Sequence, residues 1–326
     1  MLTGHQNTDL STKFTDISPK IHNFATAMKQ ILKVHHVNDY ARYIGAPELH
    51  PLVSVIHYDE LEHCHHSLNN YDVYGIFIAD EMLEELVYGL TTYDLHRHAL
   101  MCVAPGQIGG KADTGEEIQT KGWALLFDPE LLHGTDLERQ MMSYTYFSYN
   151  TNEALLMSDQ QRQTIVSLLE ALRDELKNDD QHTRHIITAI SQLVLEHIAR
   201  FYAKQLSSEA AKSNDLLTRF ENLLNRYYSE GIYRQYGMPS VKYCAQELFL
   251  SPNYFGDLVK EITGDTAGNT IRRFIMKRAQ ELLISGSTVN QAADQLGFEY
   301  PQHFTRMFKK HFGLSPSDYL KQRRQQ

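Results

Sequence analysis

The sequence lacks the features that would place a protein in a membrane or outside the cell. Its 326 residues contain no apolar run of about 18 residues, the length that a membrane-spanning helix needs. The N-terminus is polar, without the basic start and apolar core of a secretion signal. The three cysteines (Cys64, Cys102 and Cys244) are odd in number and widely spaced, which predicts reduced thiols. We therefore expect a cytoplasmic protein with no membrane partner.

Motifs that carry common enzyme chemistry are also missing. No GxSxG, P-loop or GxGxxG pattern stands in the context that its chemistry requires. The glycine-containing segment 106–110 lacks both the lysine and the spacing of a phosphate-binding loop, which predicts a turn. From this absence we expect no catalytic residue, no cofactor and no enzymatic activity.

The charge is divided unevenly along the chain. The formal net charge is −9, yet residues 216–326 carry 15 basic and 10 acidic residues, a balance of +5. The remainder carries 16 basic and 30 acidic residues, a balance of −14. This asymmetry predicts a basic module tethered to an acidic one.

In the front part of the chain, short apolar runs alternate with turn residues. The density of these runs is typical of strands in a β-barrel or sandwich. The predicted strands are Leu52–Tyr58, Val73–Ala79, Leu100–Ala104, Trp123–Phe127 and Met141–Tyr149.

The pattern then becomes helical. Ser158 is placed as the N-cap of a first helix with one apolar face. A second helix carries a seam at spacings of three and four, formed by Ile187, Ile190, Val194, His197 and Phe201. This seam predicts either a short coiled-coil contact between two copies or the cover of the front domain. The small, polar segment 207–214 that follows predicts a linker.

The C-terminal region contains an internal repeat. Ala245 and Leu248 recur as Ala293 and Leu296 at an offset of 48 residues. Further along, the offset becomes 49 residues, with Phe255, Leu258, Val259, Lys260 and Gly264 matching Phe304, Met307, Phe308, Lys309 and Gly313. Each copy predicts a helix, a tight turn, a second helix and a glycine stop, and the extra residue of the second copy falls in the turn.

The second helix of each copy has two separable faces. The apolar stripe is formed by Tyr254, Phe255, Leu258, Val259 and Ile262 in the first copy and by Phe304, Met307, Phe308 and Phe312 in the second. The outward side carries Asn253, Gly256, Asp257 and Lys260 in the first copy and Gln302, His303, Arg306, Lys309 and Lys310 in the second. For one helix, an ordinary solvated face would explain these residues. Two copies with the same kind of face, and a glycine in mid-helix that costs about 1 kcal/mol, favour a binding surface.

Residues 270–285 predict one continuous helix between the two units. Such a helix would hold the two second helices about one DNA turn (~34 Å) apart, so that both reach one duplex face. Arg272, Arg273 and Lys277 are placed either to contact phosphates or to face solvent.

At this point the residues resemble a known family, the AraC/XylS-type transcription regulators. The resemblance covers residues 216–326 and rests on many positions at fixed spacing: Val289, Ala292, Ala293, Gly297, Phe298, Phe304, Arg306, Phe308, Lys309, Lys310, Gly313, Pro316 and Tyr319. The front part resembles the cupin-like sensor domain of the same family in its architecture and in the sequence Ala104–Gln107. The resemblance implies two helix-turn-helix units that read adjacent major-groove segments, a sensor barrel that responds to a small molecule or partner, and a helical dimer contact.

The resemblance also implies roles for individual residues. Base-reading positions are Asn253, Gly256 and Asp257 in the first unit and Pro301, Gln302, His303 and Arg306 in the second. Phosphate positions are Lys260, Arg272, Arg273, Lys277, Lys309 and Lys310. Many relatives carry Arg or Gln where this chain has Gly256 and Asp257, and a carboxylate near phosphates is repelled, so the first unit is expected to read DNA weakly. Arg306 is the best candidate for a bidentate contact to guanine.

The predicted fold class is α+β. We expect a polar tail (1–19), a cupin-like barrel (20–150), a helical dimerisation segment (151–206), a linker (207–214) and an all-α tandem helix-turn-helix domain (215–326). The expected partners are double-stranded DNA, a second copy of the chain and a small-molecule effector, with RNA polymerase as a further one.

Two side-chain groups in the front part allow further hypotheses. Aromatic residues in or near the predicted strands line a ligand pocket or form plain core: Phe77, Tyr88, Trp123, Tyr144 and Tyr146. His63 and His65 would point the same way on a strand and are weak metal candidates, against the reading that they lie in an exposed loop. A metal at these histidines would make the chain a metal-dependent cupin enzyme fused to a DNA-binding module, which is the alternative function.

Overall fold

The computed structural model describes residues 31–81, 83–88, 91–96, 98–113, 115–150, 153–212 and 214–324. These residues divide into two compact units. The first unit comprises the chain up to Ser143 together with Ala154–His197, and the second comprises Tyr144–Glu153 and the chain from Ile198 onward. The polar tail predicted at 1–19 lies outside the described residues. No helix among the described residues is both long and apolar enough to cross a membrane.

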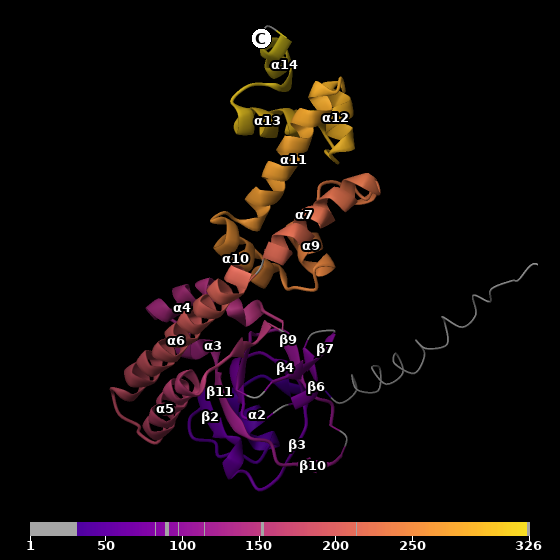
Figure 1. The fold of residues 1–326 in the computed structure, drawn as a ribbon. Coiled ribbons are helices and arrows are strands. Elements are labelled where there is room, and N and C mark those ends of the chain that lie inside the picture. Colours follow the sequence, from indigo (N-terminus) through magenta and orange to yellow (C-terminus); the bar gives the residue numbers. More distant parts are fainter. Residues whose placement is uncertain are drawn as a thin grey trace, which may run out of the picture. The chain divides into compact units, whose positions relative to one another are not determined.

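The first unit mixes strands and helices (Figure 1). Its strands are β1 (Leu32–Val34), β2 (Val53–His57), β3 (Cys64–His65), β4 (Leu68–Tyr71), β5 (Tyr74–Ala79), β6 (Leu83–Tyr88), β7 (Thr91–Leu95), β8 (Ala99–Val103), β9 (Gln107–Gly110), β10 (Glu117–Ile118), β11 (Gly122–Phe127) and β12 (Leu155–Leu156). Its helices are α2 (Val37–Tyr43), η3 (Tyr58–Glu60), α3 (Pro129–Leu132), α4 (Asp136–Gln140), η4 (Met141–Ser143), α5 (Asp159–Glu175) and the first half of α6 (Thr183–Lys212).

The strands form two five-stranded sheets and one two-stranded sheet. The strand order is β1-β4-β9-β6-β7 in one large sheet and β12-β8-β5-β11-β2 in the other, while β10 pairs with β3. Strands β1 and β4 pair in parallel, and every other strand pair among the described residues is antiparallel. The core lies between the two large sheets, because Val34 and Tyr71 from one and Ile56, Met101 and Leu126 from the other belong to a single buried cluster.

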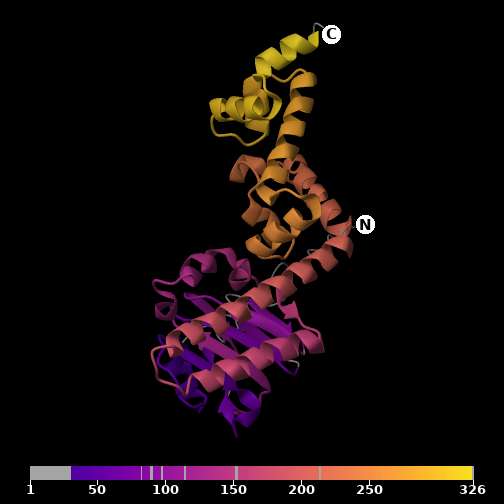
Figure 2. The ribbon, with the colours of Figure 1, turned by 90° about the vertical axis from the view of Figure 1, so that its left-hand side faces the viewer.

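Two helices cover the second large sheet on its outer face. Figure 2 shows α5 and the first half of α6 lying side by side across it. Ser158 caps α5 as predicted, and its side chain and that of Gln161 form a reciprocal capping box. Arg162 on α5 forms a bidentate ion pair with Asp80, which ties the helix to the end of β5.

Four of the five predicted strands are confirmed, as β2, β5, β8 and β11. The fifth, Met141–Tyr149, is wrong: this run forms two short 3₁₀ helices, η4 and η5 (Thr145–Ser148). A strand would have buried only alternate side chains, whereas Tyr144, Tyr146 and Phe147 are all at most 6% exposed. The mixed α+β class is confirmed, but the two large sheets share no strand, so the described residues show no closed barrel.

The second unit is helical apart from its first segment. After η5 and the second half of α6, its helices are α7 (Asn214–Ser229), α8 (Tyr233–Tyr236), α9 (Val241–Glu247), α10 (Pro252–Thr263), α11 (Ala267–Ile284), α12 (Val289–Gln295), α13 (Pro301–Phe312) and α14 (Pro316–Arg324).

The internal repeat is confirmed in this unit. The first copy is α9 followed by α10, and the second is α12 followed by α13. The turn has four residues (248–251) in the first copy and five (296–300) in the second, so the extra residue lies where the offset change places it. Both second helices end at a left-handed glycine, Gly264 with φ 71° and Gly313 with φ 78°.

The segment predicted as a linker is largely helical. Helix α6 continues through residues 207–212, and α7 begins at Asn214. The other domain boundaries stay predictions.

Candidate nucleic-acid interface

The second helix of the second copy, α13, presents a polar face opposite a buried one. Phe304 and Phe308 are fully buried, and the ring of Phe308 lies 4.5 Å from that of Phe312. The predicted base-reading residues of this helix are all exposed: Pro301, Gln302, His303 and Arg306. Because the apolar side is held by aromatic packing, the polar side is fixed toward solvent. We call α13 the second reading helix.

The second helix of the first copy, α10, is the first reading helix. Ser251 caps it, since its side chain accepts a hydrogen bond from the backbone N–H of Tyr254 at 3.2 Å. Tyr254, Phe255, Leu258 and Val259 are buried, as predicted. Asn253 is exposed, and a Cβ added at Gly256 would meet nothing within 4 Å. The glycine in mid-helix therefore has no packing reason within the described residues.

The two copies are joined by more than the helix between them. Helix α11 corresponds to the predicted connecting helix and buries Ile271, Ile275 and Leu283. In addition, a Cβ at Gly297, in the second turn, would lie 2.5 Å from the backbone of Gly237, which precedes α9. This close approach of two backbones leaves no room for a side chain and packs the turn of the second copy against the segment that precedes the first copy.

The predicted phosphate contacts are all exposed and positively charged. They are Lys260 on α10, Arg272, Arg273 and Lys277 on α11, and Lys309 and Lys310 on α13. Near the start of α11, the guanidinium of Arg272 donates to Asn269, and Arg273 lies 3.8 Å from a carboxylate oxygen of Asp265. These local contacts are exposed and leave the side chains accessible to a phosphate.

One face of the first reading helix is covered by a segment from far earlier in the chain. We call this segment the strap: residues 144–153, of which positions 151 and 152 are not described. The Thr145 hydroxyl donates to a carboxylate oxygen of Asp257 at 2.7 Å, and the Tyr149 hydroxyl donates to the same oxygen at 2.6 Å. Asp257, predicted to face DNA, is therefore half-buried and held by two donors.

At its other end, the strap places a carboxylate on the N-terminus of the same helix. The backbone N–H and the hydroxyl of Ser251 each donate to a carboxylate oxygen of Glu153 at 2.5 Å. Glu153 is 2% exposed, and burial raises its pKa although the bonds from Ser251 and Asn150 act in the opposite direction.

Stacked aromatic rings complete the contact between the strap and the rest of the second unit. The ring of Tyr149 meets those of Tyr202 on α6 and Tyr254 on α10 edge-on, at 5.1 and 5.0 Å between centroids. Tyr146 stacks on Tyr202 at 5.5 Å. The strap was not predicted from the sequence, in which the density of aromatic residues in this run is the one local signal of it.

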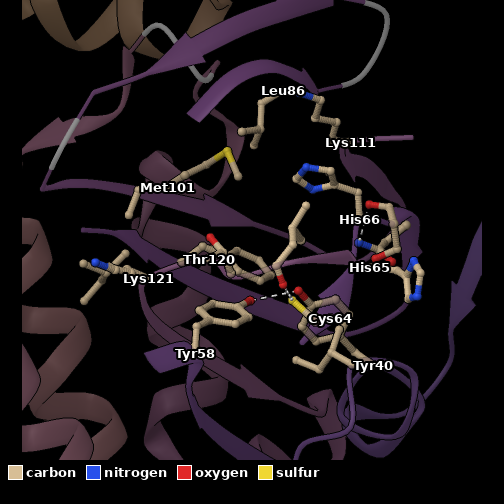
Figure 3. A pocket seen from close by; sticks show the side chains of 18 of the residues that line it. Tyr40, Tyr58, Cys64, His65, His66, Leu86, Met101, Lys111, Thr120 and Lys121 are labelled. Carbon is tan, nitrogen blue, oxygen red and sulfur yellow. Dashed lines mark hydrogen bonds between the residues drawn. The ribbon is translucent and has the colours of Figure 1, made fainter. Parts of the chain in front are cut away.

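The first unit holds a cavity of about 350 Å³ (Figure 3). Its apolar lining includes Ile44, Phe77, Leu86, Met101 and Ile118. The polar lining includes a pair of tyrosines, an asparagine and a group of basic side chains.

The tyrosines are Tyr40 and Tyr58, whose hydroxyls share a hydrogen bond of 2.8 Å. The asparagine is Asn69, which is 2% exposed and donates through Nδ2 to the Tyr71 hydroxyl at 2.9 Å. Its Oδ1 is buried without a hydrogen-bond partner among the described residues. A bound molecule that donates a hydrogen bond would satisfy this oxygen.

The basic side chains are Lys111, Lys121, His65 and His66, and no carboxylate is among the described residues that line the cavity. Burial, and then Lys111, lower the pKa of His66, so this imidazole is neutral at neutral pH. Figure 3 shows Lys111 and His66 at the same end of the cavity.

Of the five aromatic residues predicted for a pocket, Phe77 lines this cavity. Trp123 is buried elsewhere and stacks on His57 at 4.1 Å. Tyr144 and Tyr146 belong to the strap in the second unit because their run is not a strand, and the side chain of Tyr88 lies outside the described ones.

The histidines proposed as metal ligands do not form a cluster. His63 is exposed, and His65 lies 3.5 Å from a carboxylate oxygen of Asp113. Within the described parts of the chain, no group of three His, Cys, Asp or Glu side chains is placed to hold a metal.

The seam on α6 is turned into the protein. Ile187 and Val194 are fully buried and Phe201 is 9% exposed, while Ile190 and His197 are half-buried. These apolar side chains pack within their own chain, which is the second alternative that the spacing left open. Another face of α6 exposes Ile186 and Leu193, at 40% and 46%.

Comparisons with known proteins point to the same C-terminal region. Residues 244–322 match the model of a helix-turn-helix domain family. The uncharacterized transcriptional regulatory protein YesN of Bacillus subtilis is 34% identical over 84 residues, which cover 24% of this chain and 23% of YesN. The uncharacterized helix-turn-helix regulator YijO of Escherichia coli is 27% identical over 158 residues, which cover 48% of this chain and 52% of YijO.

These matches are partial, because the chain spans about a quarter of YesN and about half of YijO. Among solved structures, ToxT from Vibrio cholerae is 14% identical and is aligned over 82% of this chain and 95% of its own, with a TM-score of 0.28. A TM-score this low supports no argument about fold or function.

Proposed function

We propose that this protein, whose residues 244–322 match a helix-turn-helix domain family, is a sequence-specific, DNA-binding transcription regulator of the AraC type. Each subunit would read two adjacent major-groove segments through its two reading helices. Lysine and arginine contacts to phosphates would supply affinity, and contacts to base edges would supply the choice of site.

The observation that carries this proposal is the exposed polar face of the second reading helix. Gln302, His303 and Arg306 are exposed while the opposite side of the helix is locked by buried Phe304 and Phe308. In the first copy, Asn253 is exposed while Phe255 and Leu258 are buried, and the backbones of Gly237 and Gly297 approach closely. Two such helices at fixed spacing suit a duplex better than they suit a small substrate.

The test begins with selection of bound sites from random DNA by the full-length chain. On the selected site, Arg306→Ala should cost about 1–3 kcal/mol at one base pair and relax the preference there. Lys309→Ala should weaken binding to all sequences alike, and Lys321→Ala, on α14, serves as a charge-matched control. Equal binding to all duplexes would contradict the proposal, and identical behaviour of the Arg306 and Lys309 variants would contradict the two roles.

We further propose that the cavity of the first unit binds a small-molecule effector. The molecule that fits best is compact and mainly apolar, carries a hydrogen-bond donor for Asn69 Oδ1, and has no positive charge, because lysines and no carboxylates line the site. A screen of such compounds by thermal unfolding tests this. A ligand should raise the unfolding temperature of the wild type, and Leu86→Trp, which fills the cavity, should abolish the shift. A ligand that stabilises both equally would bind elsewhere.

A homodimer is part of the same proposal, and its support is the exposed face of α6. Ile186 and Leu193 lie two helical turns apart and remain 40% and 46% exposed. Sedimentation of the wild type should show a dimer, and Ile186→Glu combined with Leu193→Glu should give a monomer. A wild type that sediments as a monomer at all working concentrations would contradict the proposed homodimer.

On this proposal the protein has no catalytic role. Metal analysis of the purified chain addresses the alternative of a metal-dependent enzyme. Iron, manganese, nickel or zinc at near-stoichiometric level would favour that alternative.

A further inference from the structure

We propose that the strap is an intramolecular inhibitor: it holds the first reading helix in a closed state, and this helix binds DNA fully only when the strap withdraws. This inference rests on the proposed function and adds a regulatory contact to it.

The first argument is that the strap engages a group on the predicted DNA-facing side. Both donors, Thr145 and Tyr149, bond to the same oxygen of Asp257. Burial raises the pKa of the Tyr149 hydroxyl, and the carboxylate beside it raises it further, so this donor stays protonated. While the strap is in place, these two hydrogen bonds hold the Asp257 carboxylate against the strap and keep it from turning toward a base edge.

The second argument concerns the N-terminus of the same helix. A helix N-terminus with free N–H groups attracts a phosphate, because the backbone dipoles point at the anion. Here the carboxylate of Glu153 already takes the N–H and the hydroxyl of Ser251. It also adds a negative charge that repels the DNA backbone. The strap thus satisfies the groups that DNA would use and opposes DNA electrostatically.

The third argument is that the closed contact is built to be reversible. Glu153 is 2% exposed, so burial penalises the charged form of its side chain and raises its pKa. Withdrawal of the strap returns this charge to water, which offsets part of the hydrogen bonding that is lost. The hydrogen bonds of the strap stabilise the closed state, and the burial of the Glu153 charge destabilises it. Such a balance suits a contact that opens and closes better than one that stays closed.

The connectivity supplies a route for regulation. The strap is bounded on both sides by residues of the first unit, which ends at Ser143 and resumes at Ala154. A change in the first unit that shifts these two ends would shift the balance between closed and open strap. An effector could act in this way if it binds the two arrangements with different affinity.

The experiment loosens the strap at each end in the full-length chain. Thr145→Val combined with Tyr149→Phe removes both donors to Asp257 without a change of charge and with nearly the same shape. Glu153→Ala removes the carboxylate at Ser251. If the strap keeps most molecules closed, each variant should bind the selected duplex about tenfold more tightly than the wild type, because more of the protein is competent.

Matched controls separate this effect from general ones. Glu247→Ala removes the same charge from α9, where Glu247 pairs with Arg226 and not with the strap. Tyr236→Phe removes a hydroxyl from an exposed tyrosine of α8. Both controls should bind DNA like the wild type. Tighter binding by Glu247→Ala of the same size as by Glu153→Ala would show a charge effect only, and the inference would then rest on the uncharged variants alone.

Hydrogen exchange gives a second readout. In the wild type without DNA, the amides of residues 145–150 and of Ser251 should be protected, and addition of the selected duplex should speed exchange in the strap. Strap variants that bind no more tightly than the wild type, or a strap that stays protected on DNA, would overturn the inference and leave the proposed function intact. A wild type and variants that bind no duplex specifically would overturn both.

Discussion

Replacing Gly256 with alanine should change the stability of the first reading helix and its affinity for DNA in opposite directions. Gly256 lies in the interior of α10, and a Cβ added there meets nothing within 4 Å. A glycine in a helix interior costs about 0.5–1 kcal/mol relative to alanine, mainly through the entropy of the unfolded chain. Gly256→Ala should therefore raise the free energy of unfolding by about this amount, measured by denaturant titration.

The same change should weaken DNA binding. If glycine stands here so that the helix can approach a DNA backbone closely, the added methyl group pushes the duplex away. We expect the Kd for the selected site to rise by about tenfold, which corresponds to about 1.4 kcal/mol. Fluorescence anisotropy on the same preparation measures this, and salt concentration is held constant because phosphate contacts depend on it.

A second helical glycine provides the control. A Cβ at Gly268, on α11, lies off the reading helix and makes only ordinary van der Waals contacts, with Val241 at 3.8 Å and with the guanidinium of Arg272 at 3.9 Å. Gly268→Ala should leave the Kd unchanged. If the Gly256→Ala protein is more stable than the wild type and binds DNA equally well, the helix does not approach the DNA backbone closely at this position. If the variant is less stable than the wild type, the space around position 256 is not open.

Three further predictions concern stability. Gly297→Ala should lower the free energy of unfolding by at least about 2 kcal/mol, because φ at this position is 79° and the added Cβ would lie 2.5 Å from the backbone of Gly237. Denaturant titration measures this, and a smaller loss would mean that the two backbones can move apart easily. Phe249→Gly should stabilise the chain by about 1 kcal/mol, because Phe249 has φ 61° and is 81% exposed; no gain would show that its ring packs on something. Arg173 lowers the pKa of Glu60 to about 2, so this pair stabilises the fold above the unfolded pKa of about 4.5 and the contribution is lost as pH falls toward 2; acid unfolding of Glu60→Gln should lack this part of the pH dependence.

The C-terminal half of this architecture was predictable because its determinants are local. The glycine stops and the phenylalanine stripe each act within a few residues, and the structure confirms them. The single extra residue in the second turn was visible from the change of offset alone. The helical repeat therefore needed no knowledge of tertiary contacts.

The strap was not predictable in the same way. Residues 141–149 combine apolar and aromatic side chains at strand-like alternation, and β-propensity depends strongly on context. What decides their conformation is packing against Tyr202 and Tyr254, which lie more than 50 residues away in the sequence. This packing brings the strap against Asp257. The side chain of Asp257 is therefore half-buried, although the sequence predicted that it faces outward.

The lining of the cavity and the partner of the α6 seam could not be predicted from the sequence, for a related reason. The lining of the cavity comes from scattered strands and loops, and Asn69 and Lys111 gave no periodic signal. The seam spacing correctly identified one apolar face of α6, but periodicity shows only that a face is covered, not whether the same chain or a second copy covers it.

The close approach of Gly237 and Gly297 has a consequence for the DNA that this protein would recognise. Because main chain meets main chain there, we expect the angle between the reading helices to have little room for adjustment. One base pair inserted between the two half-elements of an operator turns the second by about 34° and moves it by about 3.4 Å, beyond what side-chain rearrangement can follow. Promoters under its control would therefore tolerate substitutions in the spacer between these elements but no change in the spacer's length.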